Sequence, residues 1–213
     1  MTNTTSPSVT KSIAVIGAGR VGSTLGRRWS ALGHHVVYGV RDPSDPKHSV
    51  LGPNVATVAG AVVGADIVLV ALPWGAVQAT LTGLDLGDAV VIDATNPLAV
   101  NARELAQHPE LSGAELITGW TGSHRVVKAF NTTGSANMAD PGYPQAPALM
   151  LVAGEDAEAK GAVLELAGEL GFDAADAGGL VAARDLEHVA LLWIRMAYSL
   201  GNGPGIAFTL ARR

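Results

Sequence analysis

The segment from Ser12 to Val40 reads SIAVIGAGRVGSTLGRRWSALGHHVVYGV, and this stretch decides the fold. Its first five residues, 12–16, are an apolar run that predicts a short buried strand, and the glycine-rich turn GAGRVG follows at once. Apolar residues then recur on one helical face, at Val21, Leu25, Trp29 and Leu32. A second apolar run, 35–40, predicts the next strand. Strand, glycine turn, helix and strand in this order are typical of a βαβ unit that binds a dinucleotide.

The glycines of the turn each have a physical role in such a unit. Gly17 permits the tight turn, Gly19 lets the backbone approach a pyrophosphate, and Gly22 lets the helix pack closely on the strand. The free N–H groups at the start of the helix attract an anion. We therefore expect the pyrophosphate to be held by Gly17, Ala18, Gly19, Arg20, Val21 and Gly22. A glycine-rich turn that binds no ligand is the structural alternative.

The end of the second predicted strand selects the nucleotide. NAD-binding enzymes place an acidic residue there to bind the ribose 2′-hydroxyl, whereas this chain has Arg41, followed by Asp42. A guanidinium can pair with a 2′-phosphate and stack on adenine, which favours NADP. Two alternatives stay open: Asp42 could admit NAD, or Arg41 could simply pair with Asp42 at the surface. Lys47 and His48 are interpreted as part of a solvated loop.

Further apolar runs continue the alternation of strands and helices. Strands are predicted at 66–72, 89–93, 126–130 and 148–153, and helices at 156–170 and along an apolar stripe at 186–200. Continuous apolar runs are typical of parallel strands covered on both faces. We predict an α/β fold, a Rossmann-like, doubly wound, mostly parallel sheet with a short helical C-terminal extension. Residues 1–11 are expected to form a flexible tail, and 12–213 a single NADP-binding domain with a C-terminal helical segment at 180–213.

The composition excludes several classes of function. Of 213 residues, 48% are hydrophobic and only 15% are charged, against roughly 25% charged in ordinary domains. A net charge of −5 argues against nucleic acid as a partner, because binding phosphates needs clustered Lys and Arg. The lack of cysteine excludes disulfides, thiolate-bound metals and a cysteine nucleophile. We expect a cytoplasmic protein, because neither a signal peptide nor an apolar stretch of about 20 residues is present.

Several segments resemble a known family. IAVIGAGRVGSTLGRRWSALGHHVVYGVRDP (13–43) is similar to the start of the NADP-dependent oxidoreductases of the deazaflavin coenzyme F420. The similarity continues through ADIVLVALPW (65–74), DATNP (93–97), RVVKAFNTTG (125–134), LMLVAGED (149–156) and NGPGIAF (202–208). The cytosolic NADPH-binding domain of membrane metalloreductases shares most of these motifs. The resemblance covers about nine-tenths of the chain.

The resemblance implies hydride transfer between NADP(H) and a flavin-like acceptor, either coenzyme F420 or FMN or FAD. By matching motif, Arg41 would bind the 2′-phosphate. The ribose and nicotinamide end would be lined by Ala71, Leu72, Pro73, Trp74, Asn96 and Pro97, and the carboxamide would contact Ala129, Phe130 and Asn131. This chain departs from the family at Val40, where relatives often have Ser or Thr, and in the loop 140–145, which could shape a different acceptor site.

Some of these positions also have a purely structural interpretation. Asn131 could form a turn with its own backbone, because Asn often bonds the main chain two residues on. Trp74 could simply pack at the start of a helix, and Phe130 could be an ordinary core residue. Their places after predicted strand ends favour the ligand, because ligands bind beyond the carboxyl ends of strands in open α/β sheets.

A proton donor beside the hydride site would indicate a reductase of keto groups. Lys128 is interpreted as a structural lysine whose ammonium snorkels to water, His188 as structural, and His124 as a residue that could face the cleft. The remaining histidines, His34, His35, His48 and His108, are expected at the surface. No convincing catalytic residue and no metal cluster emerges. This pattern favours hydride transfer between two cofactors, oriented by a wall formed by Pro73, Trp74, Asn131 and Met138.

Other functions stay open. The same fold could serve an NADP-dependent reductase of a small imine or keto substrate, or a sensor module that binds NADP without turnover. The apolar C-terminal helix and residues 201–208 could form the interface of a homodimer, or pack on their own domain.

Overall fold

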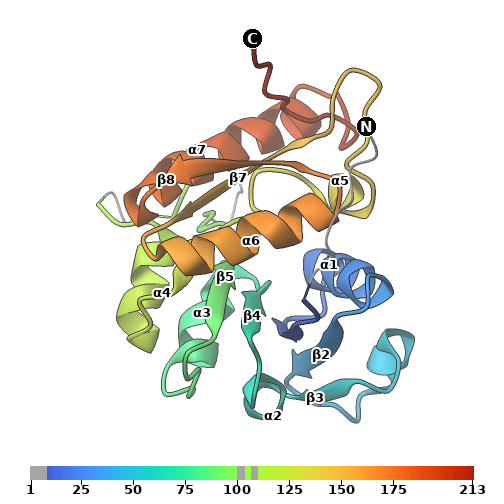
Figure 1. The fold of residues 1–213 in the computed structure, drawn as a ribbon, viewed down its shortest axis with the longest axis vertical. Helices are drawn as coiled ribbons and strands as arrows, with labels where there is room; N and C mark the ends of the chain where they lie inside the picture. The colour runs from blue at the N-terminus through green and yellow to red at the C-terminus, as the bar shows by residue number, and fades with distance from the viewer. Residues whose placement is uncertain (1–8, 100–103, 107–109) are drawn as a thin grey trace.

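The computed structural model describes residues 9–99, 104–106 and 110–213. Most of the predicted N-terminal tail, residues 1–8, and His108 lie outside this part of the chain. Eight strands form one sheet in the order β3-β2-β1-β4-β5-β6-β7-β8. All neighbouring strands are parallel except β6 and β7, which run antiparallel (Figure 1). The strands are β1 Ser12–Ile16, β2 His35–Val40, β3 Val55–Thr57, β4 Ile67–Val70, β5 Val90–Asp93, β6 Val126–Lys128, β7 Leu149–Gly154 and β8 Asp173–Gly178.

Helices cover both faces of this sheet. The α-helices are α1 Arg20–Ala31, α2 Val58–Val62, α3 Trp74–Leu81, α4 Gly113–Thr121, α5 Ser135–Ala139, α6 Ala157–Glu169 and α7 Ala183–Ile194. Two short 3₁₀ helices, η1 Pro46–Leu51 and η2 Leu180–Ala182, precede β3 and α7, and a π-helical turn, η3 Arg195–Ser199, continues α7. In Figure 1, α6 crosses the face of the sheet with α1 beside it. The predicted Rossmann-like α/β fold is therefore confirmed.

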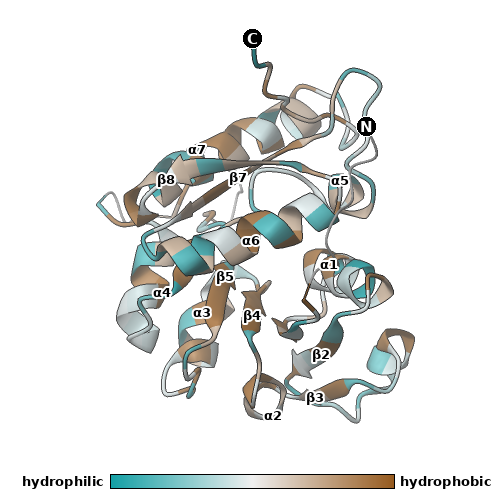
Figure 2. Ribbon diagram, viewed as in Figure 1, coloured by the Kyte–Doolittle hydropathy of each residue, from teal (hydrophilic) through white to brown (hydrophobic). Residues whose placement is uncertain are grey.

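The strands are apolar on both faces because each face has its own core. Ile13 and Val15 pack with α1, α5 and α6, whereas Ala14 and Ile16 pack with α2, α3, α4 and the start of α7. This double burial explains why the strands lack alternation of polar and apolar residues. In Figure 2, β4 is accordingly brown, and so is β5 up to its last residue, Asp93.

The structure differs from the sequence-based prediction at the edge strand β3, which was not predicted, and toward the C-terminus. β1 and β2 have the predicted bounds, but β8 was missed, because its sequence DAADAG contains no apolar run. β8 is an edge strand paired only with β7, so it needs less burial than a central strand. The predicted helical segment 180–213 is helical only to Ser199, and residues 200–213 are irregular.

The tail at 202–208 nevertheless packs on its own chain. The backbone N–H of Leu149 donates to the carbonyl of Phe208, and the Trp193 indole donates to the carbonyl of Ile206. Among the described residues, no helix is both long and apolar enough to cross a bilayer.

Candidate functional site

The sheet reverses its winding between β1 and β4, and the glycine turn lies at that point. From β1 the chain moves outward to β2 and β3, then returns to place β4 on the other side of β1. Gly17 follows β1 with φ +103°, and a Cβ there would lie 2.5 Å from the carbonyl oxygen of Ala71, which follows β4. Only glycine allows the two strand ends to approach this closely. Such a switch point is where open α/β sheets bind their ligands.

The remaining glycines of the turn allow close packing and open access. A Cβ on Gly22 would lie 2.0 Å from the carbonyl oxygen of Gly17, so this glycine is required for α1 to pack against the turn. A Cβ on Gly19 would meet nothing within 4 Å, so its backbone faces open space. Gly19 is the N-cap of α1, makes no side-chain cap bond, and the first turn holds no acidic residue. The first N–H groups of α1 are therefore free to bind an anion.

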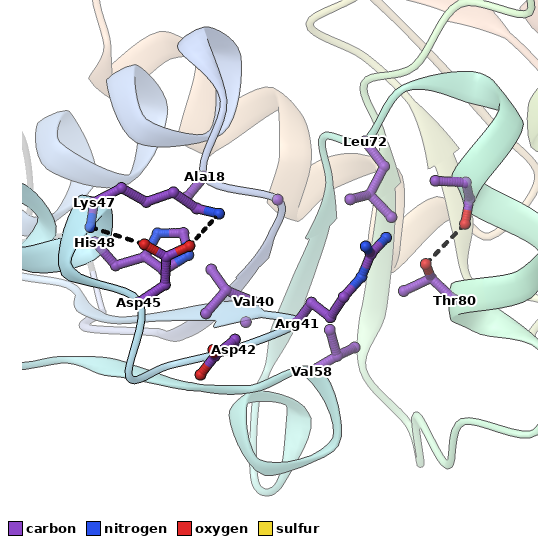
Figure 3. Close-up of a pocket in the computed structure, with 13 residues that line it drawn as sticks. Ala18, Val40, Arg41, Asp42, Asp45, Lys47, His48, Val58, Leu72 and Thr80 are labelled. Carbon is purple, nitrogen blue, oxygen red and sulfur yellow. Dashed lines mark hydrogen bonds and ion pairs between the residues drawn. The ribbon is translucent and has the colours of Figure 1, made fainter.

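One pocket opens beside this turn, at the carboxyl end of β2. Its volume is about 490 Å³, and it extends from Gly17 and Ala18 past Val40 and Arg41 to Leu72 and Thr80 (Figure 3). The guanidinium of Arg41 extends toward Leu72, while the carboxylate of Asp42 points away from it. Within the described residues, Arg41 makes no hydrogen bond or ion pair. The pocket therefore presents one uncommitted, permanently charged cation.

The acidic residues of this pocket are occupied by local partners. Asp42 accepts hydrogen bonds from the backbone N–H and the hydroxyl of Ser44, at 2.9 and 2.6 Å, and these bonds lower its pKa. Asp45 accepts from the backbone N–H of Lys47 and pairs with its ammonium, which lowers the pKa of Asp45 in the same way. In this structure Arg41 therefore does not pair with Asp42.

A second pocket lies across the glycine turn, at the carboxyl ends of β4 and β5. It has a volume of about 530 Å³ and shares Gly19 and Arg20 with the turn. The rest of its wall is formed by Val21, Ala71, Leu72, Pro73, Trp74, Gly75, Ala94, Thr95, Asn96 and Leu98. Of the predicted nicotinamide-end residues, Ala71, Leu72, Pro73, Trp74 and Asn96 meet here. Pro97 is buried behind them, in a small cavity that it shares with Trp74.

The segment after β6 supports this pocket from behind. Asn96 donates from its side chain to the carbonyl of Asn131 at 3.0 Å, and Asn131 donates to Oδ1 of Asn96 at 3.1 Å and to the carbonyl of Leu186. Asn131 is buried, and its Oδ1 has no hydrogen-bond partner among the residues that the structure describes. The side chains of Ala129 and Phe130 lie in the core and do not line the pocket.

Phe130 has a left-handed backbone, with φ 59°, which is rare for a residue other than glycine. Its ring is held edge-on against Trp29 and Phe172, with centroids 5.6 and 6.3 Å away. Its N–H donates to the sulfur of Met150. This conformation ends β6 at Lys128 and turns the chain so that Asn131 meets Asn96. Rare backbone conformations of this kind concentrate at functional sites.

His34, His124 and Met138 lie elsewhere than the sequence suggested, whereas His35 is exposed as expected. His124 is exposed at the amino end of β6, on the edge of the sheet opposite the pockets, so it does not face the cleft. Met138 fills the core beside Trp29 and is not part of the pocket wall. His34 is buried, not exposed: its Nδ1 accepts from the backbone N–H of Lys11, and its Nε2 lies 2.8 Å from Oε2 of Glu169. His188 is exposed and bonds the carbonyl of Arg184.

Lys128 is buried rather than snorkelling. Its ammonium contacts Oδ2 of Asp93 at 2.8 Å, Oε1 of Glu187 at 2.7 Å and the carbonyl of Thr95 at 2.8 Å. Burial alone would lower the pKa of Lys128, but the two carboxylates outweigh it and raise that pKa. Burial raises the pKa of Glu187. We call Asp93, Lys128 and Glu187 the buried triad.

Sequence reasoning missed the buried triad, although each member interrupts an apolar segment. Asp93 ends a buried strand, Lys128 lies within VVKAF, and Glu187 follows Leu186 on the apolar side of α7. A charge inside an apolar run indicates a partner elsewhere, but not which one. In the described part of the chain, no group of His, Asp or Glu is arranged to hold a metal ion.

The fold and the two pockets define a Rossmann-type, NADP-dependent oxidoreductase. Residues 12–97 match the family described as "NADP oxidoreductase coenzyme F420-dependent". The F420-dependent NADP reductase of Methanocaldococcus jannaschii is 30% identical over 153 residues, which is 68% of each chain. The chain therefore belongs to the coenzyme F420-dependent NADP oxidoreductase family.

Two further relatives show how far the similarity extends. The crystal structure of a candidate F420-dependent NADP reductase from Arthrobacter sp. FB24 superposes with a TM-score of 0.80 and 29% identity, covering 95% of this chain and all of the other. Rat metalloreductase STEAP3 is 30% identical over 190 residues, which is 87% of this chain. This chain spans just under two fifths of the metalloreductases that it matches, 37–39% of their length.

Proposed function

We propose that the protein binds NADP(H) across the two pockets and exchanges hydride with coenzyme F420 or with a related flavin, FMN or FAD. The observation that carries this proposal is the continuity of the site. A cationic pocket, an anion-binding helix start and a largely apolar pocket follow one another along one edge of the sheet, as the 2′-phosphate, pyrophosphate and nicotinamide of one nucleotide require. Family membership supports the same assignment.

The reaction that these ligands would supply is NADPH + F420 + H⁺ ⇌ NADP⁺ + F420H₂, in which C4 of the nicotinamide gives up two electrons with one hydrogen nucleus. The protein's part is to bind and orient. The free N–H groups at the start of α1 and the backbone of Gly19 would hold the pyrophosphate. Arg41 would bind the 2′-phosphate, since its guanidinium has no other partner in the described residues and points into the pocket.

The hydride end would be positioned by packing rather than by acid–base groups. Arg20 is the only side chain with a titratable group among the described residues that line the second pocket. A keto reductase needs a proton donor there, whereas transfer between two cofactors needs alignment at about 3–3.5 Å. This lining favours a deazaflavin or flavin acceptor over a small keto or imine substrate, and Pro73, Trp74 and Thr95 would provide the orienting wall.

The assay that tests this function follows NADPH oxidation with separate additions of coenzyme F420, FMN, FAD and a ferric chelate. Oxidation at least tenfold faster with coenzyme F420 than with the others supports the proposal in its specific form. Fast oxidation with FMN or FAD, and ferric reduction only when flavin is present, would assign a flavin-mediated metalloreductase activity instead. Tight NADPH binding without oxidation by any acceptor would contradict catalysis and indicate a sensor.

Exposed apolar residues in the last turn of α7, in η3 and directly after it support a homodimer. Leu192, Tyr198 and Leu200 are 50%, 62% and 73% exposed, and such apolar residues commonly lie in interfaces. Sedimentation equilibrium distinguishes the states, because a mass of twice 21.7 kDa supports the dimer and 21.7 kDa contradicts it.

A further inference from the structure

The buried triad lies directly behind the second pocket. Thr95, part of the pocket wall, is held on three sides: its carbonyl accepts from Lys128, and its N–H and hydroxyl donate to Oδ1 of Asp93 at 2.8 and 2.6 Å. Asp93 and Lys128 are wholly buried, so water does not compete for these bonds. The position of this wall is therefore set by the triad.

Glu187 connects the triad to Trp74, which lines the same pocket. Its Oε1 accepts from Lys128 and also from the backbone N–H of Gly113, at 2.8 Å. A Cβ on Gly113 would lie 3.0 Å from the Trp74 ring and 3.1 Å from Oε1 of Glu187. Glu187 and Trp74 also line one small cavity together. Only the side chain of Trp74 thus separates the carboxylate of Glu187 from the second pocket.

The charges of the triad do not cancel. One ammonium faces two carboxylates, so the group carries a net charge of −1 when both acids are ionised. The donors around it, the N–H groups of Gly113 and Thr95 and the Thr95 hydroxyl, are neutral. The Glu115–Arg184 ion pair lies where α4 packs on α7, and its own charges cancel. A buried net charge acts over a longer range than an exposed one, because water screens it less.

We propose that the buried triad is an anionic positioning network. It holds Thr95 in place in the wall of the second pocket, and it favours binding of the oxidised, positively charged nicotinamide over binding of the neutral reduced ring. This rests on the proposed function, which places the nicotinamide in the second pocket. A negative charge behind the ring stabilises the cation that forms as hydride leaves NADPH, and so favours donation to the acceptor. Asp93, Lys128 and Glu187 act through Thr95 and Trp74 and are positioning residues.

The test measures the dissociation constants of NADP⁺ and NADPH separately and compares their ratio. Glu187→Gln keeps an oxygen for Lys128 and Gly113 but removes the net charge. We expect this variant to lose about five- to fifteenfold in affinity for NADP⁺ relative to NADPH, as for unit charges roughly 10–15 Å apart at an effective dielectric constant of about 20. Glu169→Gln is the matched control, because it removes another carboxylate, which pairs with His34 at the opposite edge of the sheet. Its ratio should equal that of the wild type.

If the triad had a purely structural role, Glu187→Gln would weaken the binding of NADP⁺ and NADPH equally. An unchanged ratio of the two dissociation constants in this variant therefore overturns the inference while leaving the proposed function intact. Failure of the wild type to bind either nucleotide would overturn the proposed function itself. If Glu187→Gln does not fold, the ratio is measured on the wild type across pH. The titratable groups that face Glu187 are Asp93 on β5 and Lys128 on β6. Titration of the 2′-phosphate does not change the ratio, because both nucleotides carry this group. Loss of NADP⁺ preference as pH falls supports the inference, and a constant ratio contradicts it.

Discussion

Arg41 and Lys128 are two cations at the same edge of the sheet with opposite surroundings. Arg41 follows β2, is exposed, and has no partner within the described residues. Lys128 ends β6, is fully buried, and contacts two carboxylates and a carbonyl. An uncommitted charge is available to a ligand, whereas a satisfied buried charge holds the structure around it. On the proposed function, Arg41 would bind the nucleotide, whereas Lys128 would hold the pocket wall together with Asp93 and Glu187.

This comparison predicts the largest loss of stability at Lys128. Lys128→Met would leave Asp93 and Glu187 buried without a counter-charge, which costs about 3–5 kcal/mol. For a chain of this size, the melting temperature should fall by about 6–20 °C in thermal denaturation. Lys160→Met is the control, because Lys160 pairs with the half-exposed Asp176 and should shift melting by only a few degrees. Equal shifts in the two variants would contradict the assigned role of Lys128.

The glycine turn separates packing from binding at positions three residues apart. Gly22→Ala forces a Cβ to within 2.0 Å of the Gly17 carbonyl oxygen, so the melting temperature should fall by several degrees and NADPH binding should be lost. Gly19→Val has room for its side chain in the protein, but the side chain would occupy the space in front of the helix start. We expect Gly19→Val to have a near-normal melting temperature but an affinity for NADPH that is at least tenfold weaker, and calorimetry measures both quantities. Normal NADPH binding by Gly19→Val would exclude the pyrophosphate site proposed here.

Arg41→Ala should weaken the binding of NADPH without changing the stability of the protein. Loss of a charge-assisted contact to the 2′-phosphate costs about 1.5–3 kcal/mol, so NADPH affinity should fall by about 10–150-fold while NADH affinity stays the same. Because the arginine is exposed and unpaired in the described chain, melting should not change. Parallel titrations with NADPH and NADH measure the effect. An equal loss of affinity for both nucleotides would mean that Arg41 does not bind the 2′-phosphate.

The smallest effect is expected at the Glu115–Arg184 pair, which joins α4 to α7. Arg184 lowers the pKa of Glu115, and so do the backbone N–H and hydroxyl of Ser112. A lowered folded-state pKa stabilises the protein above the unfolded value near 4.5 and loses that contribution as pH falls. Glu115→Gln should lower the melting temperature at pH 7 by about 2–4 °C, for about 1 kcal/mol. The difference from wild type should vanish at acidic pH; a constant difference would contradict this.

The two halves of the chain also differ in how well their sequence predicts their structure. The glycine turn at 17–22 and the place of Arg41 after β2 could be predicted from the sequence, because both lie in or directly after one βαβ unit, where spacing alone fixes the local geometry. The buried triad could not be found this way, because its contacts join residues 35, 59 and 74 positions apart. His34 was misplaced for the same reason, since its partner Glu169 lies 135 residues away. Distant pairing depends on how the layers stack, which a local pattern does not contain.

Transfer of an isotopic label from the nicotinamide tests the central claim most directly. NADPH carrying deuterium at C4, in each of its two stereochemical forms, is oxidised by the protein in the presence of coenzyme F420, and the reduced deazaflavin is analysed by mass spectrometry. We expect one form to deliver its deuterium to the deazaflavin and the other to deliver hydrogen, because the proposed pocket would expose one face of the nicotinamide ring to the acceptor. Reduction of coenzyme F420 without deuterium from either form, or no reduction at all, would contradict hydride transfer at this site.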